Sequence, residues 1–360
     1  MISSIRCAVH CLRTNIVVGP AYLAASFILA LIIGFSAQAL GQEFYKGKPV
    51  RFIVGFSPGG GFDVYTRLIA RHMGEHIPGR PQTLVENMPG AGSLIAANHL
   101  YNRAKPDGLT VGNWVGGLIL QQVLGTGKGI EFDARKFEWI GLPVSGTQVC
   151  ALAKRSGVTS LAQWSKAKGP IKLGGEAPGS TTYDIPRVLK AGLNLPIRPV
   201  GGYKGTADIR LAVESGEIDG SCLGWDSLSS TWQKALEAGD VIVVLQAAPK
   251  PHVDLPNTPL AIDLAKTDEA RRLIQAGIHG PAALIRPYSL PPGTPKERVK
   301  ILRDAFMATM NDADFLAEAK KAKLEIGPAS GEEVEKIIAD TFALEPGLIA
   351  KLREALTSGQ

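Results

Sequence analysis

Short apolar runs alternate with helix-like stretches along most of the chain. Residues 50–56 begin with polar and apolar residues in alternation and continue as an apolar run, which is typical of a strand entering a buried sheet. After a glycine-rich turn, apolar residues recur at helical spacing from Val64 to Met73. The same order of strand, turn and helix returns in residues 82–102, and a third strand is expected at 110–114. Strands that alternate with helices predict βαβ units and a mostly parallel sheet.

The same order restarts after about residue 140. Five further strands are expected at 149–153, 171–174, 197–200, 220–224 and 241–246. Helices between them include 182–191 and one that Gly216 ends, and prolines cluster in 247–259. We therefore expect a first α/β domain at 40–142, a second at 143–250, and a segment 251–360 that returns to the first domain and adds C-terminal helices.

Two capping patterns mark helices in the C-terminal segment. Thr294 is expected to cap a helix whose first position is Pro295. Ser330 and Glu333 have the spacing of a capping box, in which each side chain accepts a hydrogen bond from the other residue's backbone.

The first forty residues have a different composition from the rest. Arg6 and Arg13 are the only charged residues before Glu43, a long apolar run follows them, and Ala37-Gln-Ala39 has the small-x-small form of a cleavage site. These three features predict a cleaved secretory signal peptide at residues 1–39. An uncleaved anchor helix is the alternative, because Ile16 to Ala39 is just long enough to span a bilayer. No cysteine stands directly after the cleavage site, so no lipid anchor is expected.

Charge and cysteine content narrow the function classes. The 360 residues include 39 basic and 33 acidic ones, and this small excess does not indicate a nucleic-acid partner. The apolar fraction of 45% excludes a disordered chain. With Cys7 and Cys11 removed in the leader, Cys150 and Cys222 remain. In an exported protein this pair could form a disulfide or stay as two buried thiols, and the sequence leaves both open.

Motifs for covalent or metal chemistry are absent. The chain has no G-x-S-x-G nucleophile elbow, no phosphate-binding P-loop, no H-E-x-x-H and no C-x-x-C. His72 and His76 are four residues apart on an expected helix, but no carboxylate pattern accompanies them. We therefore expect no enzyme activity, no catalytic residue, no bound metal and no cofactor.

Three turns between a strand and a helix share one composition. Each combines glycine with small or polar residues, namely Ser57, Gly59, Gly60, Gly61 and Asp63, then Ala91, Gly92 and Ser93, then Gly179, Ser180 and Thr181. Glycine lets a backbone approach a ligand closely, and the free N–H groups of a helix N-terminus bind carboxylate or phosphate. Turns at one edge of a parallel sheet converge. A strand-to-helix connection without any ligand uses the same residues, so one such turn would not indicate a site. Three turns of this composition favour a ligand site.

Three other residues near these turns are candidates for the ligand site. Asp63 falls in the first turn of its helix, where it is expected to orient the loop, since direct contact with an anion would be repulsive. Trp114 and Trp225 each end an expected strand, as ligand-binding residues do, and core packing is the alternative for both.

Six motifs in order resemble one known family. They are Tyr45-x-x-Lys48-Pro-Val-Arg-Phe-Ile-Val-Gly-Phe-Ser-Pro-Gly-Gly-Gly-Phe-Asp63, Val85-Glu-Asn-Met-Pro-Gly-Ala-Gly92, Pro106-Asp-Gly-Leu-Thr110, Tyr203-Lys-Gly205, Gly216-Glu-Ile-Asp219 and Pro292-Gly-Thr-Pro295. This series resembles the Bug-type (TctC-like) substrate-binding receptors of tripartite tricarboxylate transporters, over about residues 43 to 355.

The resemblance implies an α/β fold of the bilobed periplasmic binding protein type (type II, Venus flytrap), with two mostly parallel sheets and C-terminal helices. It implies that the first two turns hold a ligand carboxylate, and that the third turn contributes from the second lobe. We also expect Tyr203 and Trp225 among the ligand-binding residues. The chain departs from the family pattern after the third turn, where Tyr183-Asp184 stands in place of a common histidine. Asp184 and Asp226 could receive an amine or hydroxyl, but we expect both to face solvent.

The resulting hypothesis is a periplasmic, monomeric solute-binding protein. It would capture a di- or tricarboxylate, an aromatic acid or an acidic amino acid, and deliver it to the membrane permease subunits of a tripartite transporter. Two alternatives use the same site: an exported α/β enzyme acting on a small carboxylate, and a sensor that presents its ligand to a signalling partner.

Overall fold

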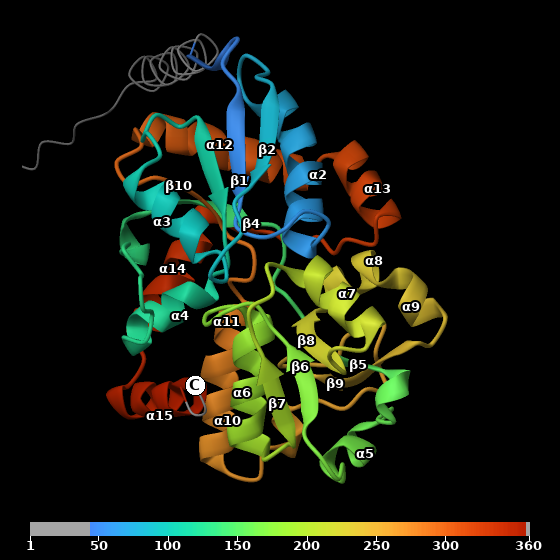
Figure 1. Ribbon diagram of the computed structural model, residues 1–360. Helices are drawn as coiled ribbons and strands as arrows, with labels where there is room; N and C mark the ends of the chain where they lie inside the picture. The colour runs from blue at the N-terminus through green and yellow to red at the C-terminus, as the bar shows by residue number, and fades with distance from the viewer. Residues whose placement is uncertain (1–43, 358–360) are drawn as a thin grey trace, which may run out of the picture.

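A computed structural model of the protein describes residues 44–357, which form two α/β lobes stacked end to end (Figure 1). The predicted signal peptide at residues 1–39 lies outside the described residues. Within residues 44–357, no helix is both long enough and apolar enough to cross a membrane.

The first lobe is built on a six-stranded sheet with the order β11-β4-β10-β3-β1-β2. β1 pairs in parallel with β2 and β3, whereas β10 and β11 are antiparallel to their neighbours. The strands are β1 (Val50–Val54), β2 (Thr83–Asn87), β3 (Thr110–Asn113), β4 (Glu138–Leu142), β10 (Tyr288–Leu290) and β11 (Ala329–Ser330). The carboxyl ends of the parallel strands therefore share one edge, which faces the second lobe (Figure 1).

The second lobe repeats this plan with a five-stranded sheet of order β7-β6-β8-β5-β9. β6 pairs in parallel with β7 and β8, and β5 runs antiparallel to β8 and β9. The strands are β5 (Gln148–Ala153), β6 (Ile171–Gly174), β7 (Ile197–Val200), β8 (Gly220–Gly224) and β9 (Val241–Gln246). A disulfide joins Cys150 of β5 to Cys222 of β8, directly opposite in the register, so the pair that the sequence left open is bonded.

Helices cover both sheets. Those on the first lobe are α2 (Gly61–His76), α3 (Leu94–Asn102), α4 (Gly117–Leu124), α12 (Lys296–Met310), α13 (Ala313–Lys321) and α14 (Gly331–Phe342). Those on the second lobe are α5 (Leu161–Ser165), α6 (Thr181–Leu193), α7 (Thr206–Ser215), α8 (Trp225–Thr231), α9 (Gln233–Glu237), α10 (Asp268–Ile274) and α15 (Pro346–Thr357). A π-helical segment Gln275–His279, the short α11 (Gly280–Ala282) and 3-10 turns at Ala134–Lys136, Lys154–Ser156 and Ile262–Leu264 complete the set.

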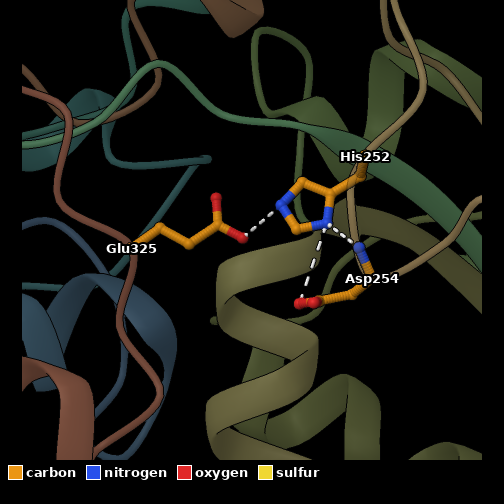
Figure 2. Close-up of side chains that lie close together, drawn as sticks. All are labelled: His252, Asp254 and Glu325. Atoms are coloured by element: carbon orange, nitrogen blue, oxygen red, sulfur yellow. Dashed lines mark hydrogen bonds and ion pairs between the residues drawn. The ribbon is translucent and has the colours of Figure 1, made fainter.

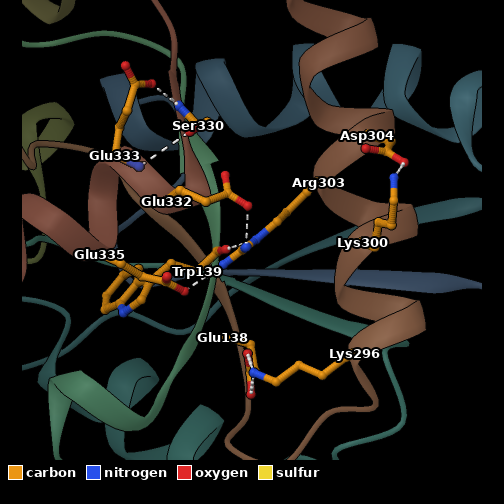
Figure 3. A network of polar contacts seen from close by, with 10 residues as sticks. All are labelled: Glu138, Trp139, Lys296, Lys300, Arg303, Asp304, Ser330, Glu332, Glu333 and Glu335. Atoms are coloured by element: carbon orange, nitrogen blue, oxygen red, sulfur yellow. Dashed lines mark hydrogen bonds and ion pairs between the residues drawn. The ribbon is translucent and has the colours of Figure 1, made fainter. Parts of the chain in front are cut away.

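The C-terminal segment divides between the two lobes. α12 and α14 pack against β4 of the first sheet, whereas α10 and α15 pack against α6 of the second lobe. Figure 3 shows how α12 and α14 are tied to β4: Arg303 donates to the Trp139 carbonyl at 2.7 Å and pairs with Glu332 and Glu335 of α14. Thus the residues after 251 do not simply return to the first lobe.

The two expected caps have different outcomes. The capping box of Ser330 and Glu333 is present, with both reciprocal hydrogen bonds formed. The expected cap at Thr294 is wrong, because the Thr294 hydroxyl donates to the Pro291 carbonyl and the helix begins at Lys296. Residues 291–294 form a turn with Gly293 at a φ of 80°, and the Thr294 N–H and hydroxyl both donate to the Pro291 carbonyl, so the hydroxyl is not available to the helix.

Each lobe has its own apolar core, and α4 takes part in both. The first core includes a cluster of four aromatic rings from Trp114, Phe132, Phe137 and Trp139. The second lobe has one core on each face of its sheet. Within α4, Leu118 and Ile119 belong to the first core, while Leu120 and Leu124 are buried with residues of α6, α10 and α15.

Candidate functional site

The candidate site is the boundary between the lobes, where helix N-termini from both sides meet. We call this boundary the waist and define it by first-lobe residues 57–63, 90–93 and 116–117, and second-lobe residues 175–184, 201–208 and 224–227. In this structure the two sides touch directly, so the lobes are closed.

The first turn, at the start of α2, is held from within and from across the waist. Asp63 accepts the Gly59 N–H at 2.9 Å and also pairs with Arg67, as its expected role in orienting the loop requires. Although burial acts in the opposite direction, hydrogen bonds from Arg67 and from the Gly59 N–H hold the pKa of Asp63 below its usual value. Ser57 donates its hydroxyl proton to Asp208 of α7 at 2.9 Å, and the Gly61 N–H approaches the Thr206 hydroxyl at 3.4 Å.

Glycine is required in this turn because the second lobe lies against it. A Cβ added to Gly60 would stand 2.8 Å from the Thr206 hydroxyl, and one added to Gly61 would stand 1.8 Å from the Ser227 hydroxyl. Real Cβ atoms essentially never come within 3.0 Å of such neighbours. The glycines therefore permit the lobes to close.

The second turn has an unusual backbone. Ala91, Gly92 and Ser93 all have positive φ, at 47°, 60° and 70°. Two of these are not glycine, and such strain persists only where surrounding structure fixes it, often at ligand-binding sites. Here the fully buried Ser93 hydroxyl accepts the Val115 N–H at 3.0 Å, and a Cβ added to Gly92 would lie 3.2 Å from the Ala177 carbonyl across the waist.

The two tryptophans have different environments. Trp114 is fully buried in the aromatic cluster of the first core, and its indole N–H donates to Ser289. Of the two possibilities for Trp114, the structure therefore shows core packing. Trp225 is half-buried and lines a cavity of about 550 Å³ between α8 and α9 on one side and residues 320–325 on the other. Tyr203 donates to Glu217 within the second lobe at 2.6 Å and does not reach across the waist.

The third turn, which leads into α6, contains buried acids of its own. Asp184 accepts hydrogen bonds at 3.1 Å from the Gly179 N–H and from Gln121 of α4. The expectation that Asp184 and Asp226 face solvent is wrong, because Asp184 is 5% and Asp226 1% exposed. Ser180 caps α6 by accepting the Tyr183 N–H, while Thr181 is the first helical residue.

A buried ion pair that the sequence does not indicate crosses the waist. Arg286, which precedes β10 in the first lobe, pairs with Asp226 of α8 at 2.7 Å and donates to the Ser227 hydroxyl at 2.6 Å. Its guanidinium also lies over the rings of Phe62 and Tyr65 of α2. The sequence shows only an arginine that directly follows the apolar run 282–285, and this does not identify a partner 60 residues away.

A second contact between the lobes lies beside the cavity. His252, Asp254 and Glu325 have possible ligand atoms within 4.8 Å of one another (Figure 2). However, Nδ1 of His252 accepts the Asp254 N–H at 3.2 Å, so Nε2 carries the proton and donates to Glu325 at 2.7 Å. With both ring nitrogens engaged, this cluster connects the lobes and does not present a metal site.

His72 and His76 also face carboxylates, contrary to what the sequence suggested. His72 lies 3.0 Å from Glu318, and His76 lies 3.1 Å from Asp312, both from the segment that forms α13. Asp312 also lies 3.9 Å from Nδ1 of His72, so both histidines share this acid, and the four side chains hold α13 against α2.

Comparisons with known proteins support the resemblance seen in the sequence. No protein-family model matches the chain. The "UPF0065 protein in tcbD-tcbE intergenic region" of Pseudomonas sp. (strain P51) is 24% identical over 332 residues, covering 91% of this chain and 92% of that protein. The "UPF0065 protein in gbd 5'region" of Cupriavidus necator is 25% identical over 345 residues, covering 93% and 96%.

Solved structures extend the comparison. Periplasmic binding protein BugD has a TM-score of 0.69 at 21% identity, covering 86% of this chain and 98% of that one. The resemblance to Bug/TctC-type receptors is confirmed. MatC from Rhodopseudomonas palustris, with bound malate, has a TM-score of 0.67 at 19% identity, covering 86% and 99%. A further R. palustris protein, with adipate, has a TM-score of 0.66 at 21% identity, covering 85% and 97%. The chain therefore has the fold of periplasmic binding proteins.

Proposed function

We propose that this Bug/TctC-type chain is a periplasmic solute-binding protein. It captures a small carboxylate between its lobes and delivers it to the membrane permease subunits of a tripartite tricarboxylate-type transporter. Binding closes the lobes, and the closed form is the one that the permease recognises. No bond in the ligand is made or broken.

One observation carries this proposal: helices from both lobes begin at glycine-rich turns that face each other at the waist. α2 begins at Gly61 and α7 at Thr206, and these two residues are in contact across the boundary. Each helix start has backbone N–H groups without helical partners and a partial positive charge, so the first-lobe side suits a carboxylate without needing lysine or arginine. Malate and adipate, bound by two proteins of this fold, are small carboxylates of the same kind.

The arrangement also supports reversible binding in place of catalysis. The buried polar side chains of the waist hold one another or the backbone, as Asp63 holds Gly59 and Ser57 reaches Asp208. Nucleophilic catalysis would need a nucleophile and a base within hydrogen-bond reach and open to a substrate. Such contacts between lobes instead form and break as the two halves close and open.

The test is a thermal-shift and calorimetric screen of the purified protein against di- and tricarboxylates, aromatic acids and amino acids. A ligand at one hundred times its Kd should stabilise the closed form by about 2.7 kcal/mol. The ligand should be recovered chemically unchanged after overnight incubation. If no carboxylate raises the melting temperature the proposal fails, and conversion of a bound ligand to product would establish the enzyme alternative.

A further inference from the structure

The turn that leads into α6 differs from the other turns of the waist because its own acids occupy it. Asp184 takes the Gly179 N–H, and Glu176 lies at the same turn, where its backbone N–H donates to the Thr182 hydroxyl. Both acids are about 95% buried. A helix start that two carboxylates already neutralise no longer attracts an anion.

Each of these acids keeps one oxygen without a partner. Among the residues the structure describes, Glu176 Oε2 and Asp184 Oδ1 accept no hydrogen bond. A buried carboxylate oxygen without a donor is costly, so these two oxygens indicate a donor that arrives from outside the protein. Burial raises the pKa of each acid to about 7, which agrees with a missing positive partner.

The charges around the turn reinforce its acidic character. Asp208 of α7 lies close enough to Glu176 to raise its pKa further. Arg187 of α6 is near Asp184, but its guanidinium stacks on Tyr183 and donates to the Tyr183 carbonyl. From the first lobe, Gln121 of α4 supplies a neutral amide to Asp184. The turn therefore carries an excess of negative charge.

First-lobe turns pack against the backbone of the segment between these two acids. A Cβ on Gly92 would lie 3.2 Å from the Ala177 carbonyl, and one on Gly117 would lie 2.0 Å from the Gly179 carbonyl. The first-lobe turns and residues 176–184 are therefore in direct contact across the waist.

From this juxtaposition we infer that the ligand is a carboxylate carrying a primary ammonium group, which Glu176 and Asp184 receive through their unpartnered oxygens. This inference rests on the proposed function and narrows it. An ammonium has three N–H donors, and charge-assisted bonds of this kind are among the strongest in proteins. A second carboxylate at the same place would be repelled.

The experiment compares acids that differ only by the amine. Isothermal titration measures binding of L-alanine against propionate, 4-aminobutyrate against butyrate, and L-glutamate against glutarate. For at least one pair, the amino acid should bind about tenfold tighter or more than its partner. The variants Glu176→Gln and Asp184→Asn should each remove most of that preference, while Glu214→Gln, an exposed acid of α7 in the same lobe, should keep it.

The possible outcomes separate this inference from the proposed function. If acids without an amine bind as tightly as their amino partners, or if the preference survives in both variants, the ammonium assignment is overturned while carboxylate binding stands. If no acid of either kind binds, the proposed function itself fails. The comparison of ligand pairs uses the unmodified protein, so it decides the matter even where a variant does not fold.

Discussion

The two sides of the waist have similar glycine-rich turns but opposite electrostatics. On the first-lobe side, the one acid of the first turn, Asp63, is paired with Arg67, and Arg286 brings a cation to the boundary. On the second-lobe side, Glu176 and Asp184 are buried with an oxygen each left unpartnered. Turn composition alone therefore predicts a helix start but not its charge, since neighbouring acids decide whether that start attracts an anion or a cation.

The largest expected effect comes from removing the cation that the first lobe contributes. Arg286→Met leaves Asp226 buried and unpaired, and loss of one partner from a buried pair costs about 3 to 5 kcal/mol. Chemical denaturation should show this loss, and small-angle scattering should show a larger radius of gyration. Arg271→Met, at an exposed arginine of α10, is the control and should change neither. A stable, compact Arg286→Met protein would mean that the pair does not hold the lobes together.

The next effect tests how the second lobe is stabilised. The disulfide joins strands of that lobe across 72 residues of sequence, so replacing Cys150 and Cys222 by alanine should cost about 2 to 4 kcal/mol. Hydrogen exchange should localise the loss to β5 and β8. Equal loss of protection in the first sheet would show that the lobes unfold as one unit.

A smaller effect concerns closure at the first turn. Gly60→Val places a branched side chain where the Thr206 hydroxyl lies 2.8 Å from an added Cβ, so ligand binding should weaken by at least about tenfold, or ~1.4 kcal/mol. Gly169→Val is the matched control, because an added Cβ there meets nothing within 4 Å. Both variants should fold, since the backbone of Gly60 has a φ of −87°. Unchanged affinity in Gly60→Val would remove the first turn from the site.

The last effect is a pH dependence that belongs to the second lobe and is absent near pH 5. Burial raises the pKa of Glu176 to about 7, so between pH 4.5 and 7 the folded ligand-free protein binds more protons than the unfolded chain, and its stability falls as pH rises. Glu176→Gln should match the wild type near pH 5 and exceed it by about 1 to 3 kcal/mol at pH 8. Parallel stability curves for the two proteins would show that Glu176 is not held in an unfavourable charged state.

Much of the fold was predictable because strands between glycine turns give strong local signals. The strands at 171–174, 197–200, 220–224 and 241–246 have the predicted bounds. Two kinds of element gave no such signal. β10 has three residues, which is too short for a pattern, and α4 is buried on opposite sides in two cores, so it lacks a polar face that would reveal helical spacing.

The candidate site was predictable only as far as local sequence determines it. The role of Asp63 followed from its place in the first helical turn, and the structure shows the hydrogen bond to Gly59. The contact of Ser57 with Asp208 joins residues 151 positions apart, and the burial of Asp184 depends on α4 packing over it. Such partners are set by how the lobes close, and no local pattern encodes them.

α4 belongs to the apolar cores of both lobes and joins them on one side of their boundary. Leu118 and Ile119 anchor it in one core while Leu120 and Leu124 anchor it in the other, so separating the lobes on that side would expose apolar surface from both. In Figure 1, α4 lies on the left of the boundary, and α8, α9 and α13 lie on the right, beside the 550 Å³ cavity. The two lobes therefore share buried apolar surface on the α4 side, whereas the cavity lined by Trp225 and Glu325 lies on the opposite side of the boundary.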